Sequence, residues 1–375
     1  MIRLITYIFI LSLFAGCNNT TSFDTSLFSE SLYTPTHAAG FEIRGCDEGG
    51  STLIVVKNPW QGADNVEQML LIDRDGKFDT AGTDVQRIDH DAERIICMSS
   101  SYVAMLSTIG KQEAIAGVSG INFISDEYVT SHKEQIGDVG YDNNINYEMV
   151  VALNPDLVLL YGLTGASSME TKLRELGIPY LYLGEYVESS PLGKAEWMVA
   201  VGEITGARDK AEELFDTISE RYTKLATEVS LASDERKQVM LNTPYRDSWF
   251  IPSEQNYIAR IIRDAGGQPF TIAGDGNSSQ PIDIEQAYIW ASQADAWLNV
   301  GACNTLEELT RQNPKFADVK AVREKHVYNN NGRQTPQGGS DFWESGVVRP
   351  DVILQDLVTI LQGREEELYY YKQLK

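Results

Sequence analysis

Cysteine is scarce in this chain of 375 residues, and its spacing excludes two common classes of small-domain architecture. The four cysteines lie at positions 17, 46, 97 and 303, and none belongs to the CxxC pair typical of a structural zinc site. Four are also too few for a disulfide framework. If Cys17 carries lipid, as argued below, then Cys46, Cys97 and Cys303 can form at most one disulfide and leave at least one free thiol.

Positive charge is also in short supply. The chain has 31 Lys and Arg residues against 54 Asp and Glu residues, which gives a formal net charge of −23. Nucleic-acid binding needs clustered basic residues to neutralise phosphates, so no nucleic-acid partner is expected. A small anionic ligand is still compatible with this balance, because one or two local arginines can bind it. The hydrophobic fraction of 42% and the length indicate a globular chain of about two domains.

Histidine and catalytic motifs are the remaining deficits. The only histidines are His37, His90, His132 and His326, and no pair has metal-ligand spacing, so no metal site is expected. The chain has no P-loop and no strand-linked GxGxxG, and the glycine after Ser119 comes one residue too early for a GxSxG elbow. The serines at 99–101 suit a helix cap. We therefore expect no catalysis, and keep a serine hydrolase as a weaker alternative.

The N-terminus has the features of an export signal. Arg3 is followed by an apolar run, Leu4–Phe14, which is too short to span a bilayer but suits a signal peptide. The sequence Leu-Phe-Ala-Gly-Cys at 13–17 resembles the lipobox of bacterial lipoproteins, which predicts a signal peptide over 1–17 and lipidation at Cys17. The alternative is an ordinary signal peptide with an incidental cysteine. Residues 18–40 are rich in Ser, Thr and Asn, which predicts a flexible tether.

The rest of the chain divides into four segments. Short strands and turns predict a β-rich extension over 41–90. Apolar strands then alternate with helices over 91–205 and again over 233–375, which predicts two α/β lobes with parallel sheets. Between them, apolar residues recur at helical spacing from Ala211 to Leu225 without Gly or Pro. This pattern predicts a single long helix over 206–232 that bridges the lobes.

An ordered series of motifs over roughly residues 90–362 resembles one family of transport proteins. Ile95-Ile96-Cys97-Met98-Ser99-Ser100-Ser101 is followed by Gly117-Val118-Ser119, then by Leu153-Asn154-Pro155-Asp156-Leu157-Val158 and by Gly202-Glu203-Ile204-Thr205-Gly206. This series is similar to that of the periplasmic binding proteins that deliver iron–siderophore complexes, cobalamin or haem to ABC importers. Residues 41–90 lie outside the common core of that family.

The resemblance implies a fold, a function and a location. The implied fold is α/β, with two Rossmann-like lobes bridged by one long helix, plus the small β-rich extension. The implied function is capture of a ferric siderophore and its delivery to an ABC importer permease, with cobalamin or haem as the alternative ligand and no resident cofactor. Binding of bare zinc or manganese is a weaker alternative, since the histidines do not converge. Lipid anchoring would place the protein in the cell envelope.

The ligand is expected in the crevice beyond the carboxyl ends of the strands. Aromatic rings in the loops there can cover a flat apolar chelate, and arginines can bind its carboxylates. The competing explanations are local ring packing and surface ion pairs. The ion pair is slightly favoured for Arg333, whereas Arg246 is the stronger candidate. The predicted ligand contacts are Ser100, Tyr102, Tyr161, Arg246, Trp249, Arg333 and Trp343.

Two acidic residues are predicted to dock on the permease. The resemblance implies one acidic residue per lobe that binds permease arginines, and Glu170 and Glu254 lie near predicted helix starts. Glu254 fits this role better than Glu170. A carboxylate in the first turn of a helix also stabilises the helix dipole, and the two roles are compatible.

Overall fold

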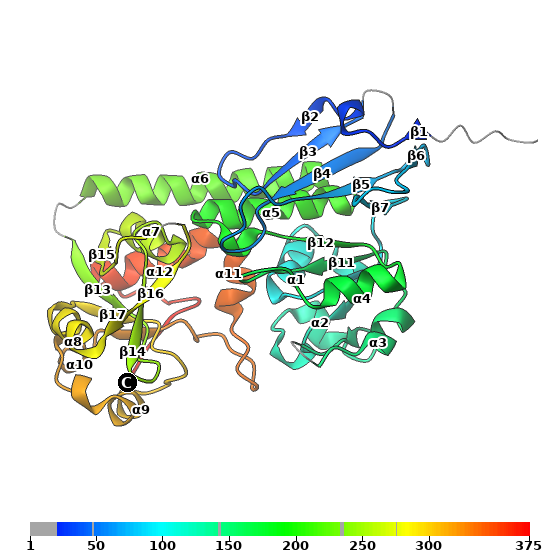
Figure 1. Ribbon diagram of the computed structural model, residues 1–375. Coiled ribbons are helices and arrows are strands. Elements are labelled where there is room, and N and C mark those ends of the chain that lie inside the picture. Colours follow the sequence, from blue (N-terminus) through cyan, green and yellow to red (C-terminus); the bar gives the residue numbers. More distant parts are fainter. Residues whose placement is uncertain (1–20, 47–48, 142–143, 233–235, 275) are drawn as a thin grey trace, which may run out of the picture.

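The computed structural model describes residues 21–46, 49–141, 144–232, 236–274 and 276–375. Two α/β lobes lie side by side beneath one long helix, α6 (Arg208–Ala232), and a separate sheet covers the first lobe (Figure 1). At about 1.5 Å per residue, the 25 residues of α6 extend over about 38 Å. The predicted fold class is confirmed, including the bridging helix and the β-rich extension.

The first lobe is built on a five-stranded parallel sheet in the order β10-β9-β8-β11-β12. All four residues of β11 are buried, because helices cover both faces of the sheet. The strands are β8 (Ile95–Cys97), β9 (Ile115–Val118), β10 (Gly137–Asp138), β11 (Leu157–Leu160) and β12 (Tyr180–Tyr182). The helices are α1 (Ser100–Thr108), α2 (Glu127–Ser131), α3 (Tyr147–Ala152) and α4 (Met169–Leu176).

The second lobe repeats this plan with the strand order β15-β13-β17-β18-β19, in which only β19 is antiparallel to its neighbour. A two-stranded hairpin, β14 with β16, stands beside this sheet. The strands are β13 (Lys237–Leu241), β14 (Ser248–Pro252), β15 (Gly267–Pro269), β16 (Ser279–Asp283), β17 (Ala296–Leu298), β18 (Val327–Asn329) and β19 (Lys372–Gln373). The helices are α7 (Tyr257–Asp264), α8 (Ile284–Gln293), α9 (Leu306–Gln312), α10 (Lys320–Arg323), α11 (Ser345–Val348) and α12 (Pro350–Gln362).

Helix α5 (Pro191–Ile204) was not expected from the sequence, and all 14 of its residues are buried. It packs along α6, beneath the extension and against the first lobe. A helix that is enclosed on every side has no polar face, so its sequence shows no amphipathic period. Only Lys194, Glu196 and Glu203 interrupt its apolar and small residues. Each of these charged side chains makes a specific contact described below.

The extension contains a five-stranded sheet in the order β2-β3-β4-β5-β7. Its strands are β2 (Glu30–Tyr33), β3 (Phe41–Gly45), β4 (Thr52–Lys57), β5 (Glu67–Ile72) and β7 (Gln86–Ile88), and β1 (Thr21–Ser22) pairs separately with β6 (Phe78–Asp79).

The flexible tether predicted for 18–40 is wrong for residues 21–40. Strand β2 pairs with β3, and Phe28 is 1% exposed with its ring centroid 5.2 Å from that of Phe78. The segment has few aliphatic residues, but its aromatic rings bury enough apolar surface to order it. Residues 18–20 lie outside the described part of the chain, as do the signal peptide over 1–17 and the lipidation site at Cys17.

The open question about the cysteines has a structural answer. Cys46, Cys97 and Cys303 are buried, and no disulfide joins any two of them. In the described ranges, no cluster of three or more His, Cys, Asp or Glu side chains is arranged to hold a metal ion. No helix in the same ranges is long and apolar enough to cross a membrane.

Candidate ligand-binding cleft

The two lobes lie opposite each other below α6 (Figure 1), and a narrow gap between them is lined by residues of both. The lobes meet through helix α11, which packs on α1 and α5, and through loops at the carboxyl ends of the strands. The backbone N–H of Ser125, which follows β9, donates to both carboxylate oxygens of Glu344 at 2.9 and 3.1 Å. The side chain of Asn277 donates to the carbonyl of Tyr186, which follows β12, at 2.6 Å. The gap therefore lies where open α/β sheets usually bind ligands.

A cavity of about 450 Å³ opens at the strand ends of the first lobe. It lies beyond β8 and β11, and Tyr161 is half-buried in its wall, where sequence analysis predicted a ligand contact. Polar and apolar atoms contribute about equally to its surface, which suits a partly apolar guest. The lining residues are Met98, Ile145, Leu160, Tyr161, Leu163, Thr164, Gly165, Ala166, Ser167, Ser168 and Met169.

Buried polar side chains cluster at the carboxyl ends of β8 and β12, and this cluster is called the floor of the first lobe. Ser99 caps α1, and Ser101 donates from its hydroxyl to Glu185 Oε1 at 2.8 Å. Burial raises the pKa of the Glu185 carboxyl, and its Oε2 atom is buried without a hydrogen-bond partner among the described residues. Ser100, a predicted ligand contact, is half-buried in the first turn of α1. The floor thus combines hydroxyl groups with one acidic group.

Lys194 supplies a positive charge at the same floor. Its ammonium donates to the carbonyl of Glu185 at 2.6 Å and lies 4.8 Å from the centre of the Tyr257 ring of the second lobe. Burial lowers the pKa of the Lys194 ammonium. Lys194 and Tyr257 line a gap of only about 20 Å³ between the lobes, together with Trp343, so the lobes are nearly closed at this depth. The sequence analysis did not identify Lys194 or Glu185 as site residues. The available signal for Lys194 was a single lysine within an apolar segment.

Two predicted ligand contacts are wrong, because their side chains belong to the core. Tyr102 is 0% exposed, and its hydroxyl donates to the carbonyls of Leu160 and Leu183 at 3.0 and 3.3 Å, which ties the ends of β11 and β12. Trp249 is also 0% exposed and donates from Nε1 to the carbonyl of Leu241 at 2.7 Å. Both rings satisfy their polar atoms internally, as buried Tyr and Trp usually do.

The remaining predicted contacts on the second lobe are accessible. Arg246 is exposed in a tight turn with φ of +57°, and its guanidinium lies 5.3 Å from the centre of the Tyr245 ring. Trp343 is 49% exposed at the edge of the gap. Arg333 is exposed but donates to Asp341 at 2.7 Å, so the ion pair that competed with ligand binding is present.

The two predicted docking residues differ in their surroundings. Glu254 is exposed in the turn that precedes α7, and its carboxylate forms no ion pair with a described residue. Glu170 lies in the first turn of α4, where it pairs with Arg174 at 3.1 Å and accepts from the Tyr182 hydroxyl at 3.1 Å. Both positions remain predictions as permease contacts, and Glu254 offers the more accessible carboxylate.

Glu344 makes the contact between lobes dependent on pH. Burial raises the pKa of this carboxyl to about 8, and Asp341 and Asp126 add to the increase. Because the folded-state pKa lies above the unfolded value near 4.5, the stabilisation is complete at low pH and is lost as pH rises towards 8. We expect the wild-type free energy of unfolding to fall by roughly 2–4 kcal/mol more than that of Glu344→Gln between pH 5 and 8. Urea unfolding at several pH values in this range measures the difference. An equal change of the free energy of unfolding with pH in both proteins would contradict the expectation.

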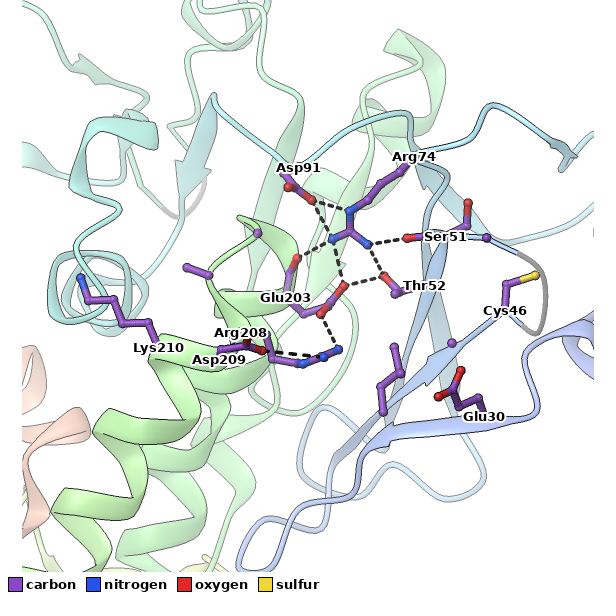
Figure 2. A pocket seen from close by; sticks show the side chains of 16 residues that line it. Glu30, Cys46, Ser51, Thr52, Arg74, Asp91, Glu203, Arg208, Asp209 and Lys210 are labelled. Carbon is purple, nitrogen blue, oxygen red and sulfur yellow. Dashed lines mark hydrogen bonds and ion pairs between the residues drawn. The ribbon is translucent and has the colours of Figure 1, made fainter.

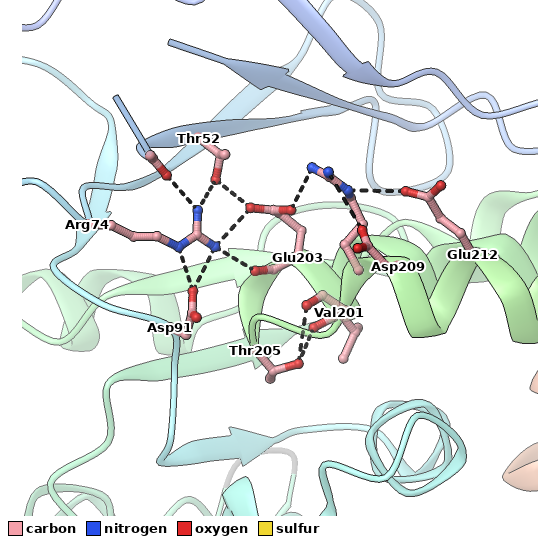
Figure 3. Close-up of polar contacts among 11 residues, drawn as sticks. Thr52, Arg74, Asp91, Val201, Glu203, Thr205, Asp209 and Glu212 are labelled. Atoms are coloured by element: carbon pink, nitrogen blue, oxygen red, sulfur yellow. Dashed lines mark hydrogen bonds and ion pairs between the residues drawn. The ribbon is translucent and has the colours of Figure 1, made fainter. Parts of the chain in front are cut away.

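A larger cavity of about 650 Å³ lies at the junction of the extension with α6, away from the strand ends (Figure 2). Glu203 lies at its centre between two arginines: Arg74 donates to Oε1 at 2.9 Å, and Arg208 pairs with Oε2 at 3.1 Å (Figure 3). Arg74 also donates to Asp91 at 2.7 Å, and Thr52 donates to Glu203 at 2.7 Å.

These central charges satisfy one another, so they do not recruit a ligand. All three nitrogens of the Arg74 guanidinium have acceptors, which include the carbonyl of Gly50. Thr52 and Arg74 belong to the extension, whereas Glu203 and Arg208 belong to the lobe and the bridging helix. The network therefore joins the extension to the first lobe, and the cavity lies at the interface between them.

Comparisons with known proteins agree with this geometry. A sequence profile of the family described as periplasmic binding protein matches residues 95–331. An uncharacterised lipoprotein of Methanocaldococcus jannaschii is 25% identical over 341 residues, which cover 84% of this chain and 78% of that protein. A cobalamin-binding protein of Halobacterium salinarum is 25% identical over 255 residues, which cover 64% of this chain and 66% of that protein.

A solved structure shows the same fold. The crystal structure of a periplasmic haem-binding protein from Pseudomonas aeruginosa aligns with a TM-score of 0.58 at 17% sequence identity. The alignment covers 76% of this chain and 98% of that protein. At this level of identity the likeness is one of fold, which is the two-lobed arrangement described above.

Proposed function

We propose, since this chain belongs to the periplasmic binding protein family, that it captures a ferric siderophore between its lobes and delivers it to a membrane permease. Family and fold are those of substrate-binding proteins of the ABC importer type, which are not enzymes. The proposal rests on one observation: two lobes joined by a single long helix meet at a gap lined by Lys194, Tyr257 and Trp343, and a cavity beside Tyr161 opens at the strand ends of the first lobe.

The exposed side chains around the gap favour a flat, partly apolar and anionic guest. Phe123, Tyr186 and Trp343 are each at least 40% exposed, although such large rings are normally buried in a monomer. Arg246 is exposed in a chain whose net charge is −23, and a guanidinium binds carboxylates or catecholates by paired hydrogen bonds. Cobalamin and haem share the apolar surface, so they remain the alternative ligands. The cobalamin-binding protein of Halobacterium salinarum supports cobalamin, whereas the haem-binding structure supports the fold alone.

A thermal-shift panel of ferric siderophores, cobalamin and hemin tests the function. A ligand at 100 times its dissociation constant should stabilise the protein by about 2.7 kcal/mol, which is a shift of several degrees. Iron-free siderophores serve as ligand controls. Trp343→Ala and Arg246→Ala should reduce the shift, and Lys172→Ala, on the outer face of α4, should leave it unchanged. Absence of any shift across the panel would contradict the proposal.

The same panel separates the three ligand classes. If hemin alone stabilises the protein and Tyr161→Phe alters its absorption spectrum, Tyr161 is an axial ligand and the siderophore proposal is wrong. If cobalamin alone stabilises it, the binding site is the same and the cargo differs. We expect no turnover of ester or phosphate substrates; turnover abolished by Ser100→Ala would instead favour a hydrolase.

Delivery requires a membrane location and a permease. We propose that Cys17 carries lipid and holds the protein in the cell envelope, with its relative among archaeal lipoproteins as support. We propose further that Glu254, and more weakly Glu170, contact permease arginines. Charge reversal at Glu254 should slow ligand transfer to the permease without changing ligand affinity, because Glu254 lies outside the gap between the lobes.

A further inference from the structure

We infer that the loop between β4 and β5, residues 58–66 of the extension, is a third wall of the ligand cleft, and that Gln61 and Asn277 form a clasp across the lobes. The inference rests on the proposed function, because it assigns to this loop a part in holding the guest. The extension lies outside the matched family region, 95–331, so this wall is a feature of this chain added to the two-lobed core.

The extension is held firmly enough for its loop to act as a fixed wall. Besides the Glu203 network, two buried carboxylates of the first lobe bind the segment that leads into β3. Glu196 accepts from the Tyr33 hydroxyl at 2.8 Å and from the backbone N–H groups of residues 36–38. Glu188 accepts from the N–H groups of Ala39 and Gly40, each at 3.0 Å. These bonds fix the sheet to α5 and to the loop after β12.

The loop itself is closed at its base and packs on the strand ends of the first lobe. Asn58 donates its backbone N–H to the carbonyl of Val66 at 2.8 Å. The Trp60 ring lies edge-on to Tyr182 at 5.3 Å between centroids. Gln61 donates its N–H to the carbonyl of Leu163, which lines the 450 Å³ cavity, at 2.9 Å. The loop therefore contacts a segment that lines the candidate binding cavity.

A glycine makes room for this approach. A Cβ atom on Gly162, which follows β11, would lie 2.9 Å from two atoms of Trp60. Such a contact is too short for any residue except glycine without movement of the loop. The close fit shows that the loop packs tightly on the segment after β11, which continues into the lining of the cavity.

The loop then reaches the second lobe. Gln61 donates from Nε2 to the backbone carbonyl of Asn277 at 3.2 Å. The Asn277 side chain in turn donates to the carbonyl of Tyr186 in the first lobe at 2.6 Å, and accepts from the N–H of Tyr257 in the second at 3.3 Å. One residue of the second lobe thus bonds to the extension, to the first lobe and to the start of α7. Separation of the lobes breaks the first two bonds together.

The clasp should bias the lobes towards closure and slow ligand release. Neutral hydrogen bonds of this kind typically change an equilibrium by about three- to ten-fold. Since the clasp breaks when the lobes separate, its loss should appear mainly in the dissociation rate of the ligand. Gln61 and Asn277 are accordingly positioning residues, and neither needs to touch the guest.

The distance between the lobes tests the clasp without any ligand. Spin labels at Leu176→Cys on α4 and Ile289→Cys on α8, both exposed, report the separation in the full chain. The same chain without these cysteines controls for labelling of the native thiols. Gln61→Ala and Asn277→Ala should add a population at longer distance, and Gln61→Glu, which places a carboxylate against a carbonyl, should do the same. Gln280→Ala, on the exposed face of β16, is the matched control and should leave the distances unchanged.

Ligand kinetics complete the test with the compound identified in the thermal-shift panel. The Gln61 and Asn277 variants should raise the dissociation rate about three- to ten-fold, and Gln280→Ala should not. Unchanged distances in all Gln61 and Asn277 variants would overturn the clasp, even if a ligand binds. If the distances lengthen but no compound in the panel binds, the clasp stands and the proposed cargo is wrong. Circular dichroism excludes variants that fail to fold.

Discussion

Trp249→Ala should lower the free energy of unfolding by about 3–5 kcal/mol. The Trp249 ring lies in a buried aromatic cluster, 5.6 Å from Trp297 and 4.9 Å from Phe316 between ring centroids. Truncation removes one of the two tryptophan side chains of this cluster and leaves a cavity that the surrounding rings fill only in part. It also leaves the carbonyl of Leu241 without its indole donor.

Urea unfolding followed by circular dichroism measures this loss. The matched control is Trp343→Ala, because Trp343 is 49% exposed and its removal should cost about 1 kcal/mol or less. Ligand affinity should depend more on Trp343 than on Trp249. Trp343→Ala should therefore weaken ligand binding more than Trp249→Phe, a variant that should still fold. Equal destabilisation by the two alanine substitutions would contradict the assignment of Trp249 to the core.

Glu196→Ala should detach the N-terminal segment of the extension from α5 and destabilise the protein by about 3–5 kcal/mol. The Glu196 carboxylate is 0% exposed and accepts from the Tyr33 hydroxyl and from three consecutive backbone N–H groups. Alanine leaves all of these donors without an acceptor in a site that is closed to water. Unsatisfied buried donors each cost about 1–3 kcal/mol, offset in part by local rearrangement.

Hydrogen exchange identifies where the loss occurs. Amides of residues 30–40 should exchange much faster in Glu196→Ala, whereas amides of β13 and β17 in the second lobe should be unaffected at low denaturant. Glu196→Gln keeps one acceptor oxygen and should give an intermediate loss of stability. Glu220→Ala removes an exposed carboxylate of α6 and is the control. Uniform acceleration of exchange in both lobes would argue that the extension has no separate attachment.

The parts of the fold that sequence predicts well are those whose pattern is local. The run Leu157–Leu160 is apolar because both faces of its sheet are covered, and it forms β11. The recurrence of apolar residues after Ala207 predicts α6 because one side of that helix faces α5 and α12 while the other is exposed. In both cases the environment repeats along the segment, so the sequence records it.

The parts that sequence predicts poorly depend on partners far away in the chain. Helix α5 has no polar face because the extension, α6 and the first lobe enclose it. Residues 21–40 resemble a tether by composition, and they become ordered only through contacts such as that between Tyr33 and Glu196, which are 163 positions apart. No local pattern announces such a contact.

The candidate site shows the same division. Tyr161 and Trp343 lie at the cleft, as the positions of their loops predict, because parallel strands bring their carboxyl ends to one edge. Trp249 also follows a strand, β13, that ends at this edge of its sheet. Its side chain nevertheless lies in the core, because the segment that contains it forms strand β14 of the hairpin with β16. Lys194 and Asn277 could not be assigned in advance, because their roles arise from contacts between separate units.

The enclosure of α5 has a consequence for the order of assembly. The strands of the extension emerge from the ribosome before α5, yet the ring of Phe41 in β3 packs against Trp197 at 4.8 Å between centroids. Until residue 204 has been made or exported, this sheet exposes an apolar face with nothing to cover it. Contacts of such long sequence separation form slowly. Truncated chains that end before α5 should therefore aggregate.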